Sequence, residues 1–325
     1  MNNPVLKLTQ RIFGPYFWWR VRMNIVGIAQ DFWKDPPKPG SERKPKKPLP
    51  EEKGESTSEA SKVAPQPSVT NKQKKIWYAD RSQVLEKIWG DGKILPGNDD
   101  FLNQLLAPLG LNKEKNALDL AAGLGGLARK MVDDFDTYIR GLEPDAALAR
   151  RGMTMSINAG KQKHAGIEHY DPASFKADKH YDCIVARELF YRVIGKNKFF
   201  KAISSGLKSK GQIVFTDYIL DPKARKNEVI TAWMAHEPEA APLSMSEMVQ
   251  AWTELGFDMR VNEDQTPMYR HEILMSLVKF AYFLAYNPPD EETKPVVLHE
   301  VETWGRRVAA MEHGLKFCRF YAIKV

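Results

Sequence analysis

The stretch ALDLAAGLGGLARK, residues 117–130, decides the fold. Residues 117–122 form an apolar run that predicts a buried strand, the glycines after it predict a tight turn, and the remainder predicts a helix. Glycine lets the backbone approach a ligand, and the helix that follows offers free N–H groups to an anion. Gly123, Gly125 and Ala128 match the GxGxxA pattern of dinucleotide sites, but the same turn also fits a smaller carboxylate ligand or no ligand at all.

Acidic residues at three predicted strands distinguish these alternatives. Asp119 lies inside the first strand, where its carboxylate would repel a pyrophosphate and attract an ammonium group. Glu143 ends the second strand and suits the hydroxyl groups of a ribose, and Asp171 after the third strand suits an adenine amino group. Each acid alone is typical of a solvated loop, whereas the ordered series favours a nucleoside cofactor that carries an amino-acid group.

Strands and helices alternate from residue 76 onward, which predicts one α/β domain over residues 76–325 with a mostly parallel sheet covered on both faces. We expect strands at 117–122, 138–143, 166–170, 181–186 and 212–218, and a closing antiparallel pair at 257–262 and 317–325. Helical insertions at 226–256 and 266–314 would cover the carboxyl edge of the sheet, where such folds bind ligands. The apolar run 272–286 predicts a buried lid helix, because it is short for a membrane span and contains Lys279.

Four segments occur in the order of a known motif set: ALDLAAGLGG at 117–126, GLEPD at 141–145, YDCIVARELFYRV at 181–193 and LKSKGQIVFTDY at 207–218. Together they resemble the class I S-adenosylmethionine-dependent methyltransferases, over roughly residues 76–325. EKIWGDGKILPGND at 86–99 and GLKFCRFYAIKV at 314–325 are similar to segments of the phosphoethanolamine N-methyltransferases. The resemblance implies a Rossmann-like sheet of seven mostly parallel strands with helical lid insertions, and S-adenosyl-L-methionine as the cofactor.

The resemblance also implies which residues surround the cofactor. They are Ile94, Leu95, Asp119, Ala121, Gly123, Gly125, Glu143, Asp171 and Arg187, with Asp119 supporting the glycine turn. Ala121 departs from the family by standing where its first glycine is found. A small residue is accommodated there if its φ is negative.

The methyl acceptor is left open by the same resemblance. Trp77 or Tyr78 falls where the phosphoethanolamine enzymes place an active-site tyrosine, and Tyr218 keeps its counterpart. Arg192 stands in place of a histidine, and HEPEAAPLS at 236–244 replaces the phosphate-binding segment. The fold and the cofactor therefore carry over, while the substrate is left open.

Methyl transfer from a sulfonium is an in-line displacement, which requires alignment more than a strong base or a metal. Candidate groups around the methyl are Tyr78, Glu188, Tyr191, Arg192, Tyr218 and His236. Arg192 stays charged, so it would bind an anionic group, unless it is a solvated surface residue. His236 could act as a base for a hydroxyl or carbon acid, although a lone histidine in a helical insertion also fits a structural role.

Charge and cysteine content restrict the class of protein. Residues 1–75 contain 15 of the 48 basic and 7 of the 41 acidic residues, so this segment carries the excess positive charge of the chain, whose formal charge is +7, and the rest is close to neutral. This distribution argues against a nucleic-acid substrate, which requires basic residues on the folded binding face. Cys183 and Cys318 lie in predicted strands without a CxxC or zinc-binding spacing, which indicates buried thiols in a reducing, cytoplasmic compartment.

Two segments precede the predicted domain. Residues 1–33 are aromatic and basic, and Arg20 and Arg22 interrupt their apolar run, so they fit an amphipathic membrane-interface helix better than a membrane span or signal peptide. Packing of the same aromatic residues on the protein's own body fits equally well. Residues 34–71 are rich in Pro, Lys, Glu and Ser, which predicts a disordered linker. Peripheral membrane contact through residues 1–35 is therefore one expectation.

The leading interpretation is a methyltransferase that uses S-adenosyl-L-methionine and modifies a small-molecule or lipid-like acceptor, with amines among the candidates. The changed residues at Arg192 and His236 motivate an alternative, a membrane-tethered scaffold that keeps the fold without turnover. A nicotinamide dehydrogenase is the third interpretation, because the glycine pattern alone permits it.

Overall fold

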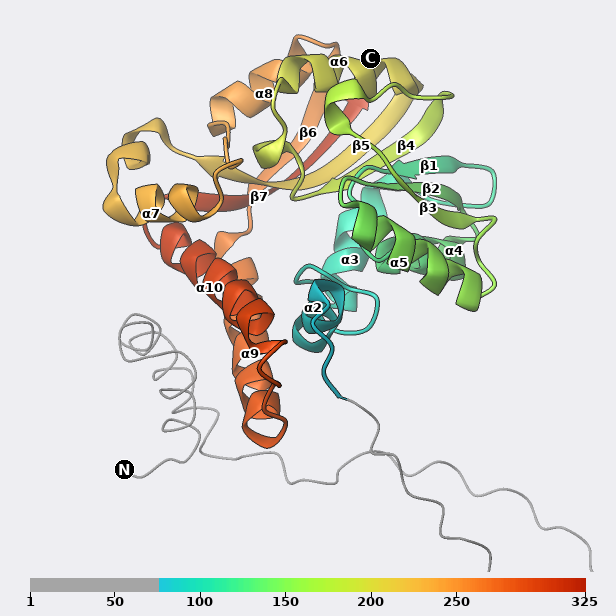
Figure 1. Ribbon diagram of the computed structural model, residues 1–325. Helices are drawn as coiled ribbons and strands as arrows, with labels where there is room; N and C mark the ends of the chain where they lie inside the picture. Colours follow the sequence, from blue (N-terminus) through green and yellow to red (C-terminus); the bar gives the residue numbers. More distant parts are fainter. Residues whose placement is uncertain (1–75) are drawn as a thin grey trace, which may run out of the picture.

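The computed structural model describes residues 76–325, so the expectations for residues 1–33 and 34–71 lie outside the described residues. Residues 76–325 build one seven-stranded sheet with helices on both faces (Figure 1). The strand order is β3-β2-β1-β4-β5-β7-β6, and β1 to β5 pair in parallel. β7 runs antiparallel to both β5 and β6. The predicted parallel sheet and its closing antiparallel pair are confirmed.

The strand bounds lie close to the predicted ones. They are β1 (Asn116–Asp119), β2 (Tyr138–Glu143), β3 (Ala165–His169), β4 (Tyr181–Arg187), β5 (Leu207–Leu220), β6 (Phe257–Asp264) and β7 (Leu315–Lys324). β5 begins before its predicted start because Leu207 already pairs with Tyr181 of β4. β1 ends earlier than predicted, at Asp119, and the chain then enters the glycine turn.

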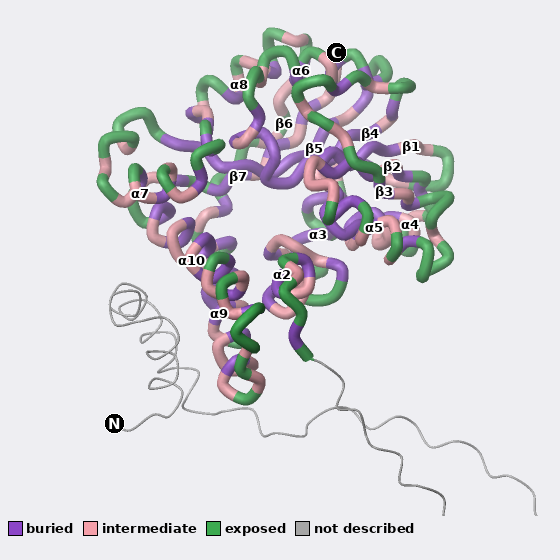
Figure 2. The backbone as a smooth tube through the Cα atoms, in the orientation of Figure 1, coloured by how far each residue is buried: buried purple, intermediate pink, exposed green. Residues whose placement is uncertain are grey.

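Helices cover the sheet through two buried apolar clusters, one on each face. One cluster includes residues of α2 (Arg81–Trp89), α3 (Asp99–Leu106), α4 (Gly126–Phe135) and α5 (Ala146–Asn158). The other includes residues of α6 (Lys196–Gly206) and α8 (Met245–Thr253). Short 3-10 helices occur at Ala107–Leu109, Pro172–Ser174, Phe190–Arg192 and Pro222–Lys226. Figure 2 shows that the central strands are buried while the outer turns of the helices are exposed.

The two expected insertions are helical. The first contains α7 (Glu228–His236) and α8, and the second contains α9 (Thr266–Tyr286) and α10 (Lys294–Met311), which project from the sheet beside α2 (Figure 1). α9 buries Ile273, Leu274, Leu277, Phe280 and Leu284, as expected for a packed lid helix. Among the helices of residues 76–325, we find none with the length and apolar character needed to span a bilayer.

A close backbone contact ties the segment before α3 to the first turn of α4. A Cβ atom on Gly126 would lie 2.5 Å from the carbonyl oxygen of Gly92. Ile94 and Leu95 lie two and three positions after Gly92, so the position of these two side chains depends on a residue without a Cβ at the start of α4.

We predict that Gly126→Ala destabilises the protein, because the Gly92 backbone must move to admit the new methyl group. The free energy of unfolding should fall by about 1–3 kcal/mol, the usual cost of overpacking. Urea denaturation of both proteins measures this change. An unchanged midpoint and slope would show that the contact is not a constraint.

Candidate functional site

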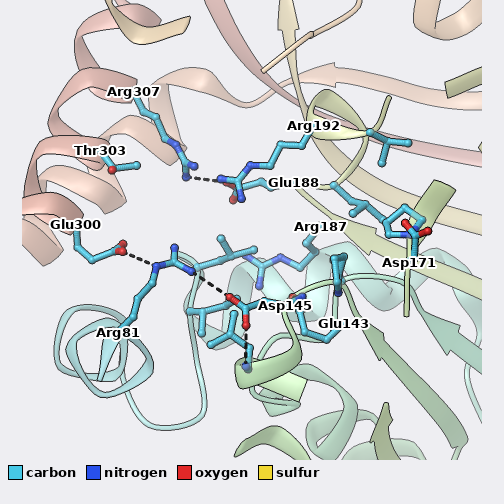
Figure 3. A pocket seen from close by; sticks show the side chains of 18 of the residues that line it. Arg81, Glu143, Asp145, Asp171, Arg187, Glu188, Arg192, Glu300, Thr303 and Arg307 are labelled. Carbon is cyan, nitrogen blue, oxygen red and sulfur yellow. Dashed lines mark hydrogen bonds and ion pairs between the residues drawn. The ribbon is translucent and has the colours of Figure 1, made fainter. Parts of the chain in front are cut away.

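A cavity of about 380 Å³ opens at the carboxyl ends of β1, β2 and β4 and is bounded on the far side by α10 (Figure 3). Its lining combines charged residues from the sheet edge with charged residues from two helices. The lining includes Arg81, Ile94, Leu95, Ala121, Glu143, Asp145, Asp171, Arg187, Glu188, Arg192, Ile194, Glu300, Thr303, Trp304 and Arg307. Asp119 lines a narrow adjoining pocket that shares Ile94, Leu95, Ala121 and Arg187 with the cavity.

The glycine turn is fastened to the end of β2 by a carboxylate. Glu143 accepts a hydrogen bond from the Gly123 N–H at 2.7 Å and another from the Asp145 N–H at 2.9 Å. Gly123 and Gly125 have positive φ values of 55° and 76°, which glycine adopts without strain. Ala121 does not have a positive φ, so its Cβ is accommodated. The turn and the strand end therefore form one unit, with the N-terminus of α4 directly after it.

Burial disfavours negative charge beneath the cavity. Desolvation raises the pKa of Asp119 to about 7, and the charge of Glu143 adds to the rise. The N–H of Ala121 donates to Asp119 at 3.0 Å and, together with the charge of Arg187, opposes it. Desolvation also raises the pKa of Glu143, against the two backbone hydrogen bonds that it accepts. A cationic ligand group beside Asp119 would restore its ionised form.

Arg187 lines the cavity where it meets the narrow pocket that contains Asp119. Its Nη2 donates to the carbonyl oxygen of Pro96, and its guanidinium lies over the ring of Phe101 with 5.5 Å between the guanidinium carbon and the ring centroid. Its Nε is buried and has no hydrogen-bond partner. A buried N–H donor that has no partner and lies in a cavity wall can donate to an anionic or carbonyl group of a ligand.

A buried ion network joins α10 to the sheet edge. Arg307 donates to both carboxylate oxygens of Glu237 at 2.7 Å and lies 3.5 Å from Glu188 Oε2. Arg192 also donates to Glu237, at 3.1 Å. Burial alone would raise the pKa of Glu237, but the charges of Arg307 and Arg192 and the hydrogen bonds that it accepts hold this pKa well below its usual range. Glu188 has a φ of 52°, a backbone conformation that residues other than glycine rarely adopt.

A family model described as a methyltransferase domain matches residues 94–260, just over half of the chain. The chain belongs to this methyltransferase family. Phosphoethanolamine N-methyltransferase 1 of Zea mays is 22% identical over 200 residues, which cover 60% of this chain and 38% of that protein. The chain therefore spans well under half the length of this curated relative.

Solved structures share the methyltransferase fold at low sequence identity. Phosphoethanolamine N-methyltransferase 2 of Haemonchus contortus, in complex with S-adenosyl-L-methionine, matches with a TM-score of 0.66 and 18% identity over 75% of this chain and 56% of that one. A 4+2 cyclase matches with a TM-score of 0.59 and 17% identity over 76% of this chain and 94% of that one. The predicted class I methyltransferase fold is confirmed.

The structure brings the predicted cofactor residues of this methyltransferase together. Ile94, Leu95, Ala121, Glu143, Asp171 and Arg187 line the cavity, Asp119 lines its extension, and Gly123 and Gly125 form the turn beside it. Residues from three strand ends and from the segment before α3 thus converge on one space (Figure 3).

The predicted acceptor residues are more dispersed. Arg192 and Glu188 line the cavity. Tyr218 is fully buried behind Arg307, with 5.6 Å between its ring centroid and the guanidinium carbon, and Tyr191 is buried beside it. The cavity lining does not include Tyr78, Tyr191, Tyr218 or His236. The Tyr78 side chain is exposed.

His236 is connected to the cavity indirectly. Its Nε2 lies 2.8 Å from Thr303 Oγ1, while the Thr303 hydroxyl donates to the His299 carbonyl oxygen at 2.9 Å. When the Thr303 hydroxyl donates to that carbonyl, the Nε2–H of a neutral His236 donates to Thr303. Desolvation lowers the pKa of His236, so the imidazole favours its neutral form.

The wall made by α10 was not predicted from the sequence. Glu300, Thr303 and Arg307 line the cavity from one face of this helix, and Trp304 lines it beside them. Their spacing of three and four residues was the available signal, because it places polar side chains on one helix face. Arg81 was missed too, since nothing in the sequence around it indicates that α2 approaches α10.

We predict that Asp119→Asn stabilises the protein at high pH. A carboxyl whose folded pKa is about 7 contributes stability that is present below its unfolded pKa of 3.8 and is lost as the pH rises through 7. The variant lacks this loss. The difference in unfolding free energy should be small at about pH 4.5 and reach about 2 kcal/mol or more at about pH 8. Denaturant titrations at both pH values measure it, and a pH-independent difference would contradict the assignment.

Proposed function

We propose that the protein is an S-adenosyl-L-methionine-dependent methyltransferase that acts on a small amine bearing an acidic group. The observation that carries the proposal is the ordered set of acids at one sheet edge. Asp119, Glu143 and Asp171 stand at or just after the ends of β1, β2 and β3, around the glycine turn. Their carboxylates match the ammonium, ribose and adenine groups of this cofactor in sequence order.

The residues present fit each part of the cofactor. Asp119 would hold the ammonium group, and Arg187 Nε would donate to the carboxylate near the N-terminus of α4. Glu143 would accept from the ribose hydroxyls and Asp171 from the adenine amino group. Ile94 and Leu95 would pack on the adenosine. When bound, the cofactor supplies an electrophilic methyl group on a sulfonium.

The part of the cavity between the end of β4 and α10, which we take as the acceptor half, is lined by charged side chains and has no evident strong base. Arg192 lines it and could bind an acidic group of the acceptor. The protein's contribution to an in-line transfer would be to align the nitrogen and exclude water. The amine acceptor also agrees with the Zea mays relative, which is a phosphoethanolamine N-methyltransferase.

The first test is cofactor binding. S-adenosylhomocysteine should bind the full-length protein more tightly as the pH rises through 7, because Asp119 then carries the charge that pairs with the ligand ammonium. Asp119→Asn should weaken binding about tenfold at about pH 8 and abolish this pH dependence. Asp133→Asn on the exposed side of α4 is the matched control. Calorimetry measures each dissociation constant, and equal affinity in the Asp119 variant would reject the proposed site.

Turnover is tested with labelled S-adenosyl-L-methionine and a panel of small amines with and without acidic groups. We expect transfer to an acid-bearing amine, with activity reduced in Asp119→Asn and retained in Asp133→Asn. Cofactor binding without transfer to any member of this panel or of a broad metabolite and lipid extract would instead favour the scaffold alternative.

We further propose, from the sequence of residues 1–35, that the protein contacts membrane surfaces and accepts a lipid-like substrate there. Ile194 supports this idea, because it is 84% exposed and lies among the residues that line the cavity. The full chain should float with anionic liposomes, and salt should weaken this binding. A protein lacking residues 1–35 should stay in the soluble fraction; equal flotation of the two proteins would reject the proposal.

A further inference from the structure

Among the described residues that line the cavity, two buried polar atoms have no hydrogen-bond partner. One is Arg187 Nε, which belongs to the proposed cofactor half. The other is Glu300 Oε2 on α10. The Glu300 side chain is only 1% exposed, and Figure 3 shows it extending from α10 toward Arg81. A carboxylate oxygen at this depth is costly to leave without a partner.

The charge of Glu300 is only partly compensated within the protein. Its Oε1 lies 2.5 Å from Arg81 Nε, but the Arg81 side chain is 47% exposed and also lies 4.0 Å from Asp145. Arg81 therefore shares its charge with two carboxylates and remains in contact with solvent. The second oxygen of Glu300 has no donor within the described chain.

The other acids of the cavity wall are already engaged. Glu143 accepts from two backbone N–H groups, and Glu188 accepts from the Tyr269 hydroxyl and pairs with Arg307. Asp145 and Asp171 cap helices through backbone N–H groups. Glu300 is thus the buried wall carboxylate, among residues 76–325, that keeps a vacant oxygen.

The surroundings of Glu300 favour a cationic ligand. Trp304 lies one helical turn further along α10 and also lines the cavity, and its ring already faces one cation, the Arg307 guanidinium at 4.4 Å. A carboxylate beside an aromatic side chain is a common environment for an ammonium group. The proposed function pairs the cofactor ammonium with Asp119, so a cation that binds Glu300 would come from another molecule.

We propose that Glu300 Oε2 binds an ammonium group of the methyl acceptor and that Arg81 competes for the same carboxylate. This inference rests on the proposed function and adds a specificity determinant to it. An amine can donate an N–H to Glu300 both when protonated and after it loses its proton. A hydroxyl in the same place donates only one hydrogen and carries no charge, so the site selects amines over alcohols of the same shape.

The test uses the full-length protein saturated with S-adenosylhomocysteine, with ethanolamine as the cationic probe and ethylene glycol as its neutral isostere. Glu300→Gln should weaken ethanolamine binding about tenfold while leaving ethylene glycol binding unchanged. Glu302→Gln is the matched control, because Glu302 lies on the same helix and pairs with Arg306 outside the cavity. Its affinity for ethanolamine should equal that of the unmodified protein.

Arg81→Gln provides a second, independent variant at a half-exposed position. Removing the competing cation should strengthen ethanolamine binding about threefold. The affinity for S-adenosylhomocysteine should be unchanged in all three variants. The inference is overturned if ethanolamine does not bind, if Glu300→Gln binds it normally, or if this variant loses cofactor affinity instead. Failure of the unmodified protein to bind S-adenosylhomocysteine would reject the proposed function itself.

Discussion

The buried guanidinium of Arg307 holds the two halves of the cavity together. It is 2% exposed and lies between Glu237, which follows α7, and Glu188, which follows β4. Because a buried charge without its partner costs about 3–5 kcal/mol, α10 cannot move far from the sheet edge while these carboxylates remain ionised. The distance between the proposed cofactor residues of the sheet and the polar face of α10 is set by this network. The strained φ of Glu188 is sustained by the same contacts.

Positions that follow from local rules could be predicted from the sequence. A parallel strand ends at the sheet edge where ligands bind, so Asp119, Glu143 and Asp171 could be assigned to one edge once their strands were recognised. The glycine turn could also be predicted, because it follows from the local pattern of a strand, glycines and a helix. The assignment of Arg187 and Ile94 to the cofactor site depended on the family resemblance, because no local pattern connects the segment before α3 with the end of β4.

The α10 wall could not be predicted, because it depends on contacts across the chain. Arg307 and Glu188 are 119 positions apart, and Arg81 and Glu300 are 219 apart. An amphipathic pattern indicates that such a helix has a polar face, but not which cavity this face meets. Tyr218 illustrates the opposite difficulty. Its strand was predicted correctly, yet the side chain is enclosed by Tyr191 and Arg307 and lies outside the cavity lining.

The hairpin of α9 and α10 leaves and re-enters the sheet at neighbouring points. Asp264 at the end of β6 is paired with Cys318 of β7, so the entire segment between them closes a connection between adjacent antiparallel strands. The entropy of closing such a connection changes slowly with its length. Relatives could therefore carry a different segment in place of α9 and α10, and with it different residues on that side of the cavity. The residues at the other strand ends would remain as they are. Divergence of substrate choice within this architecture would then be concentrated in one contiguous stretch of the gene.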